Sequence, residues 1–164
     1  MGQISRHFTL EELLASPTAT AKGIDEQFTP SAQVVENLTV LAQKVLDPVR
    51  DLIDAPLVSS SGYRCERLNS AIGGERTSQH LTGCADDITS PAVPVDDLYQ
   101  KIKESNIAFD QLIIEHDGAG HRWVHISYNN EPGAVQRGEC MKGSLRPGGG
   151  TDCVPDGHGA FKQA

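Results

Sequence analysis

Apolar residues recur at helical spacing in the first third of the chain. Thr9 and Glu12 have the spacing of a capping box, which predicts that a short helix begins there. A second helix is predicted to begin at Thr29, which is followed by a proline at the first helical position. Its apolar residues follow the helical period of about 3.6 residues: Val34, Val35, Leu38, Leu41, Ala42 and Val45. Pro48 is expected to kink or end this helix, because proline lacks the backbone N–H that a helix interior uses.

Short strands and helices alternate in the middle of the chain. The pattern predicts strands at residues 57–64, 84–90, 109–115 and 121–128, and helices at residues 65–74 and 95–106. The last two strands are expected to form a β-hairpin, because Asp117, Gly118 and Gly120 between them are turn residues.

This order of elements predicts an α+β fold, with a small antiparallel sheet and flanking helices. Residues 1–130 are expected to form the folded domain. Residues 131–164 hold eight of the 16 glycines and show little periodicity. We therefore predict a poorly ordered or loosely packed C-terminal tail, which can still pack on the same domain.

Composition and charge narrow the function classes. The chain has 164 residues, of which 38% are hydrophobic and 22% charged, so one domain with a true core is expected. The net charge of −8 and the lack of Lys/Arg runs argue against nucleic-acid binding. The N-terminal residues lack the features of a secretory signal, and no apolar stretch is long enough to span a membrane. We expect a monomer without stable membrane insertion that is cytoplasmic as synthesised.

Four cysteines leave two interpretations open. Cys65, Cys84, Cys140 and Cys153 contain no C-x-x-C pair, which argues against a thiolate zinc site. They are either free thiols, some of them buried, or they include a disulfide between Cys140 and Cys153 that closes the glycine-rich tail.

The segment SQHLTGCADD, residues 78–87, contains two candidate metal ligands, His80 and Asp87. Taken singly, His80 is most often a polar loop residue. A catalytic zinc ion uses three protein ligands and an open position, whereas structural zinc sites are usually closed by four. The strand at residues 121–128 offers a third ligand, because alternation places His121 and His125 on one face.

These residues resemble the zinc-binding pattern of the M15 peptidases. That family includes D-alanyl-D-alanine carboxypeptidases, D-Ala-D-Ala dipeptidases and phage L-alanyl-D-glutamate endolysins, and it shares its fold with the Hedgehog signalling domain. The matching positions are Ser78, His80, Gly83, Ala85 and Asp87, followed by Trp123 and His125. The segments FTLEEL, SGYR (residues 61–64) and FDQLI also match, so the resemblance covers roughly residues 7 to 128.

The resemblance implies that His80, Asp87 and His125 bind Zn²⁺, and that the adjacent Asp86 faces away. Gly83 would let the chain turn between His80 and the strand that carries Asp87. Arg64 would hold an anionic group of the substrate or stabilise charge on a tetrahedral intermediate.

The chain departs from the family at the general base: many members carry an acid three residues before the last histidine ligand, whereas Arg122 stands there in this chain. Two candidates remain, Glu115 and His121. Glu115 lies on the same face as His125 if it pairs with Trp123, whereas a shift of one residue puts a histidine there instead. We favour Glu115, because a carboxylate is the commoner partner of the attacking water.

The resemblance therefore implies a zinc metallopeptidase that cuts a stem peptide or cross-link of bacterial peptidoglycan. A phage or prophage endolysin, which acts in the periplasm or cell wall after holin-dependent release, would fit the absence of a signal peptide. The bond is left open among D-Ala-D-Ala, L-Ala-D-Glu and the D-Ala to diaminopimelate cross-link. Two other classes also remain: a non-catalytic zinc-containing module that binds the wall, and a virion structural component.

Overall fold

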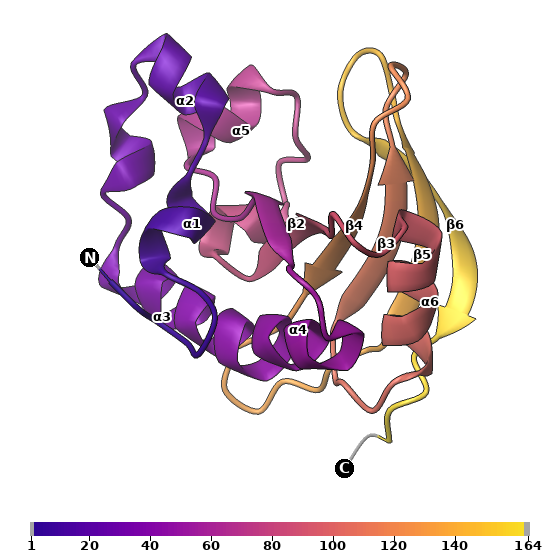
Figure 1. Ribbon diagram of the computed structural model, residues 1–164. Coiled ribbons are helices and arrows are strands. Elements are labelled where there is room, and N and C mark those ends of the chain that lie inside the picture. The colour runs from indigo at the N-terminus through magenta and orange to yellow at the C-terminus, as the bar shows by residue number, and fades with distance from the viewer. Residues whose placement is uncertain (1, 163–164) are drawn as a thin grey trace.

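The computed structural model describes residues 2–162, in which helices pack against a six-stranded sheet (Figure 1). The strands are β1 (Val58–Ser61), β2 (Ala85–Thr89), β3 (Gln111–His116), β4 (Arg122–Ser127), β5 (Glu139–Leu145) and β6 (Thr151–His158). Their order across the sheet is β1-β2-β4-β3-β5-β6, and β3 and β5 are parallel while the other neighbours are antiparallel. The predicted α+β class with flanking helices is confirmed, but the sheet is larger than expected and includes one parallel pair.

The α-helices are α1 (Leu10–Leu14), α2 (Pro17–Lys22), α3 (Ala32–Leu41), α4 (Asp47–Ile53), α5 (Glu66–Ala71) and α6 (Val95–Glu104). Two 3-10 turns, η1 (Asp25–Phe28) and η3 (Gln79–Thr82), and a π-helical turn, η2 (Ala42–Leu46), complete the set. The capping box of Thr9 and Glu12 is confirmed at α1. No helix among the described residues is long and apolar enough to cross a membrane.

The second predicted helix begins later than expected and does not end at Pro48. Its N-cap is Ser31, whose hydroxyl accepts a hydrogen bond from the Val34 N–H, so the predicted cap at Thr29 is wrong. The helix also continues past Pro48, through the π-helical turn η2 into α4. In that turn the Asp47 N–H donates to the Ala42 carbonyl five residues back, and this wider turn accommodates the proline that follows.

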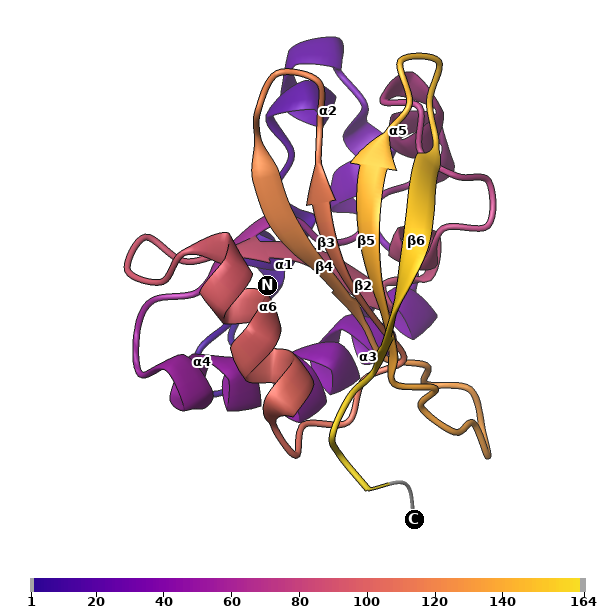
Figure 2. The same cartoon turned by 90° about the vertical axis from the view of Figure 1, so that its right-hand side faces the viewer.

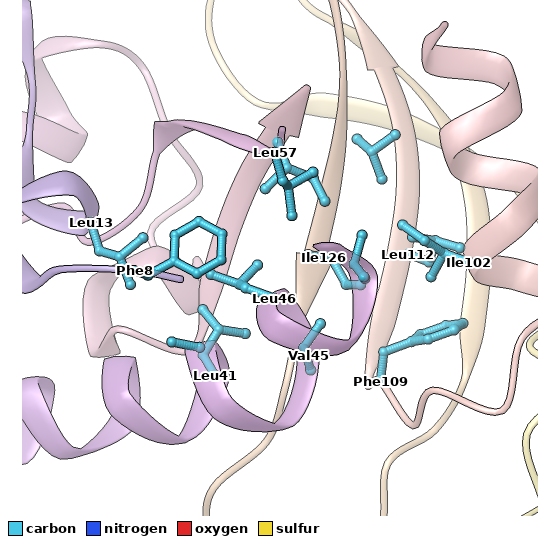
Figure 3. Packing of buried hydrophobic residues seen from close by; sticks show 14 of the residues in the cluster. Phe8, Leu13, Leu41, Val45, Leu46, Leu57, Ile102, Phe109, Leu112 and Ile126 are labelled. Carbon is cyan, nitrogen blue, oxygen red and sulfur yellow. The ribbon is translucent and has the colours of Figure 1, made fainter. Parts of the chain in front are cut away.

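The core lies between α3, η2, α4 and α6 and one face of the sheet (Figure 3). Its fully buried side chains include Phe8, Leu41, Val45, Leu46, Ile102, Phe109, Leu112 and Ile126. Because strand side chains alternate, Val124 and Ile126 of β4 enter this core, while Trp123 and His125 face the opposite side. The core thus fixes the sheet against the helices and leaves its other face free to carry a site.

The C-terminal segment is not the loosely packed tail that its composition predicts. Strand β5 pairs along the whole of β3, and β6 pairs back onto β5 (Figure 2). The Tyr99 hydroxyl of α6 donates to Asp156 of β6 at 2.7 Å, and Phe161 contacts Phe109 edge to face. These contacts to distant parts of the chain order a segment whose own sequence shows no periodicity.

The cysteines are free thiols, so the predicted disulfide between Cys140 and Cys153 is wrong. Cys140 is fully buried in the core, whereas Cys153 is exposed. The register of the hairpin separates them, because Cys153 pairs with Gly143 rather than with Cys140.

Candidate metal centre

Three buried side chains from separate elements converge on one point: His80 of η3, Asp87 of β2 and His125 of β4. Their candidate ligand atoms all lie within 4.8 Å of one another. Asp87 and His125 are direct partners in the β2–β4 pairing, so the sheet itself sets their separation. The Asp87 Oδ1 atom lies 3.3 Å from His80 Nε2 and 3.2 Å from His125 Nδ1.

The local sequence aims His80 at the two strand residues. The Ser78 hydroxyl accepts from the His80 N–H and begins η3. Gly83 ends η3 with a φ of +76°, and an added Cβ would lie 2.9 Å from the Val34 carbonyl oxygen of α3. Only glycine combines this conformation with so close an approach, so Gly83 directs the chain from His80 into β2.

The donor set fits a metal ion. His80 Nδ1 lies 2.7 Å from the Gly62 carbonyl oxygen, which fixes the proton on Nδ1 and leaves a lone pair on Nε2. That Nε2 atom is buried and has no hydrogen-bond partner among the described residues. It faces a carboxylate oxygen, so two electron-pair donors meet at 3.3 Å. A cation between them would satisfy both, and two imidazoles with one carboxylate are a ligand set that suits a divalent transition metal.

The electrostatics favour the protonation states that metal ligands need at two of the three residues, His80 and Asp87. Burial lowers the pKa of His80 and so keeps its ring neutral. Burial alone would raise the pKa of Asp87, but the hydrogen bond and charge of His125 hold it below its ordinary value, so Asp87 stays ionised. For His125, burial is outweighed by the hydrogen bond and charge of Asp87, which raise its pKa. A metal at this point would therefore have to displace a proton from His125 at acidic pH.

Arg64 contacts the carboxylate oxygen of Asp87 that does not face the two histidines. Its Nη2 atom is 3.0 Å from Asp87 Oδ2, while Nε donates to Ser61 and Nη1 to Asn69. Its side chain is only 12% exposed. These contacts orient the carboxylate of Asp87. The Arg64 side chain also lines the adjoining cavity, so it is placed where a substrate can reach it. Its predicted contact with an anionic group of the substrate stays a prediction.

Asp86 points away from the cluster, as expected. It pairs with Ile126 of the core, is fully buried, and accepts a hydrogen bond from the Ser59 hydroxyl at 2.7 Å. Its second oxygen has no partner within the described part of the chain. Burial raises its pKa well above the ordinary value, so Asp86 is not a ligand candidate.

Glu115 joins the cluster from β3. It pairs with Trp123, the register in which it shares a face with His125. Its Oε1 atom lies 3.9 Å from His125 Nδ1 and accepts from the Trp123 indole at 3.2 Å, while Oε2 accepts from the Thr151 hydroxyl at 3.4 Å. Burial raises the pKa of this carboxyl above its usual range. A carboxylate with a raised pKa beside a metal cluster has the properties of a general base.

Comparison with known protein families decides the wider assignment. The family model described as Peptidase M15 matches residues 6–127.

The chain belongs to the M15 peptidase family.

No curated protein is similar enough to this chain to match it. Membership in the M15 family supports a hydrolytic peptidase, and the three converging residues could hold a metal ion.

The structure does not bring His121 into the M15 site. His121 lies in the turn before β4, its side chain is 77% exposed, and its Nδ1 atom is 2.7 Å from Asp117. Arg122, at the position where many relatives carry an acid, forms two hydrogen bonds with Asp96 instead. Neither residue is among those that line the cavity beside the cluster.

A cavity of about 520 Å³ adjoins the cluster and gives it access to a substrate. One wall is the loop between α5 and η3, and the floor is the sheet face that carries His125 and Glu115. Part of this floor comes from the C-terminal hairpin and was not predicted from the sequence: Met141, Leu145, Thr151 and Cys153. These residues lie outside the family match, and no local pattern marks them.

Proposed function

We propose that this M15 peptidase is a zinc-dependent enzyme that hydrolyses a peptide bond in bacterial peptidoglycan. The observation that carries the proposal is the meeting of His80, Asp87 and His125 beside a buried carboxylate, Glu115, at the edge of a cavity. Three ligands leave a coordination position open, which is typical of catalytic rather than structural zinc.

Zinc, when bound by these three residues, would polarise the scissile carbonyl and make water a better nucleophile. Glu115 takes one proton from the attacking water as the new C–O bond forms. It then passes that proton to the amine as the C–N bond breaks. The hydrogen bonds from Trp123 and Thr151 hold both carboxylate oxygens, so Glu115 meets the water in one orientation.

Arg64 has a positioning role in this scheme. Through Asp87 it fixes one ligand of the metal, and its guanidinium adds positive charge near the place where the carbonyl oxygen becomes negative. A direct contact with an anionic group of the substrate is a further part of the proposal.

The substrate assignment rests on the family. Peptidoglycan peptides are the substrates of the M15 enzymes that the sequence pattern resembles. We propose a phage or prophage endolysin that acts in the periplasm or cell wall after holin-dependent release. A non-catalytic wall-binding module is the alternative, and the observation that favours it is Arg122 in place of the common acid.

Digestion of purified peptidoglycan tests the proposal. Wild type and Glu115→Gln are compared with zinc content measured on both, and the products are identified by mass. Glutamine keeps the size of the side chain and removes the base, so the variant should keep zinc and lose about 10²–10⁴-fold in rate. Defined fragments from wild type would also name the bond. If wild type binds zinc fully and cleaves nothing, the peptidase proposal is wrong and the non-catalytic wall-binding module takes its place.

A further inference from the structure

The floor of the cavity extends well beyond the metal cluster. In register with His125 lie Ile113 of β3 and then Met141 of β5. In the next row Glu115 is followed by Gly143 and Cys153, which carries the floor onto β6. The sheet face therefore offers a surface for substrate on the side of β5 and β6, away from β2.

The loop of residues 72–79 is fastened to the C-terminal part of the chain at both of its ends. At one end the Gly150 N–H donates to the Gly73 carbonyl at 2.9 Å, and Glu75 accepts from the Thr151 N–H at 3.1 Å and from Arg146 at 3.2 Å. We call this contact between residues 73–75 and the hairpin tip the latch. Figure 2 shows the tip close to α5, and residues of both partners line the cavity.

At the other end of the loop, Gln79 donates to Asp110 at 3.0 Å, and Asp110 is held in turn by two hydrogen bonds from the Arg137 guanidinium. The loop is therefore joined to the tip of the β5–β6 hairpin at one end and to Asp110, just before β3, at the other. A peptide that lies on the floor meets a continuous wall on this side.

Two large apolar side chains beside the latch are left partly in solvent. Ile72 is 43% exposed and Leu145 is 37% exposed, and both line the cavity. Exposed apolar side chains that line a cavity are typical of a surface that a ligand covers. The nearby carboxylate of Glu75 is already paired with Arg146, so the surface that stays open to a ligand beside the latch is apolar.

We propose that the latch closes the cleft on the β5–β6 side, so that this side accepts only a short peptide end. This inference rests on the proposed peptidase function and deepens it. The chain can continue freely on one side of the scissile bond and must stop soon after it on the other. The C-terminal hairpin, which lies outside the family match, is thus the part that sets substrate length.

Three variants separate the latch from the rest of the hairpin. Glu75→Ala removes the two hydrogen bonds that the exposed Glu75 side chain accepts. Gly149→Ala places a Cβ 2.9 Å from the Gly73 carbonyl oxygen and wedges the two partners apart. Gly148→Ala is the matched control in the same turn, because a Cβ there meets nothing within 4 Å.

The test uses the zinc-loaded full chain and synthetic stem peptides extended by two residues on one side or the other of the cut bond. We expect one of the two extensions to lower kcat/KM at least about tenfold in wild type and in Gly148→Ala. The penalty should shrink severalfold in Glu75→Ala and Gly149→Ala. Equal tolerance of both extensions in wild type, or an unchanged penalty in both latch variants, would overturn the inference while leaving the peptidase intact. Failure to cut any peptide in the zinc-loaded state would remove the proposed function as well.

Discussion

Gly83 connects the turn η3, which carries the candidate metal ligand His80, to strand β2, and its replacement by alanine tests how the site is assembled. The φ of +76° is a left-handed conformation that costs an L-residue about 1–2 kcal/mol. An added Cβ would also lie 2.9 Å from the Val34 carbonyl oxygen and 3.1 Å from Leu38 Cγ. Both neighbours belong to α3, and Leu38 is fully buried, so they have little room to withdraw. Overpacking of this kind costs about 1–3 kcal/mol more.

Gly83→Ala should therefore lower the free energy of unfolding by about 2–5 kcal/mol. For a chain of this length, each kcal/mol lowers Tm by about 2–4 °C. The matched control is Gly23→Ala. Gly23 has a φ of +64°, but an added Cβ meets nothing within 4 Å, so only the conformational cost of about 1–2 kcal/mol applies.

Urea denaturation and competition with a zinc chelator measure both effects. Gly83→Ala is expected to lose more stability than Gly23→Ala and to bind zinc more weakly, because a displaced η3 moves His80 relative to Asp87. Equal losses of stability in the two variants, with zinc affinity unchanged in both, would refute the argument that close packing of this turn builds the site.

Three further predictions concern the rest of the molecule. Asp86→Asn should stabilise the protein increasingly as pH rises above about 4, by up to about 1.4 kcal/mol per pH unit. The reason is that the raised pKa of Asp86 keeps its carboxyl group protonated in the folded protein, whereas the same group ionises in the unfolded chain. A difference in urea denaturation that does not change with pH would contradict this. Tyr99→Phe removes the hydrogen bond to Asp156 and should cost about 1 kcal/mol, measured as a lower Tm together with faster hydrogen exchange in β6; unchanged exchange would mean that this contact does not hold the strand. Cys153 should react first with a thiol reagent in the native state, because the other three cysteines are buried, and mass analysis that finds Cys140 modified first would contradict the hairpin register.

The three candidate metal ligands were expected from the resemblance to the M15 pattern, and the structure brings their side chains together. One turn and one glycine separate His80 from Asp87, and strand alternation places His125 on a definite face. The hairpin register was the open point in the sequence. The structure selects the pairing of Glu115 with Trp123, and the Asp117 side chain supports it by accepting from two backbone N–H groups of the turn at 2.9 Å.

The C-terminal hairpin could not be predicted, because its order comes from partners far away in the sequence. Strand β5 is held by β3, and β6 by contacts with α6, while glycines and Pro155 hide any alternation of its own. The same cause explains the wrong cap at Thr29 and why the helix does not end at Pro48. The cap at Ser31 and the π-helical turn before Pro48 depend on how α3 and α4 pack in the folded protein. This packing cannot be predicted from local helix propensity.

Zinc stoichiometry tests the central claim most directly. Wild type, His125→Ala and His121→Ala are loaded with zinc, dialysed against buffer and measured for metal and protein. His121 is the matched control, because it lies on the same segment but is exposed and bonded to Asp117. One zinc per chain in wild type and His121→Ala, and almost none in His125→Ala, is the predicted result. Equal zinc in all three proteins, or none in wild type, would contradict the assignment of the metal centre.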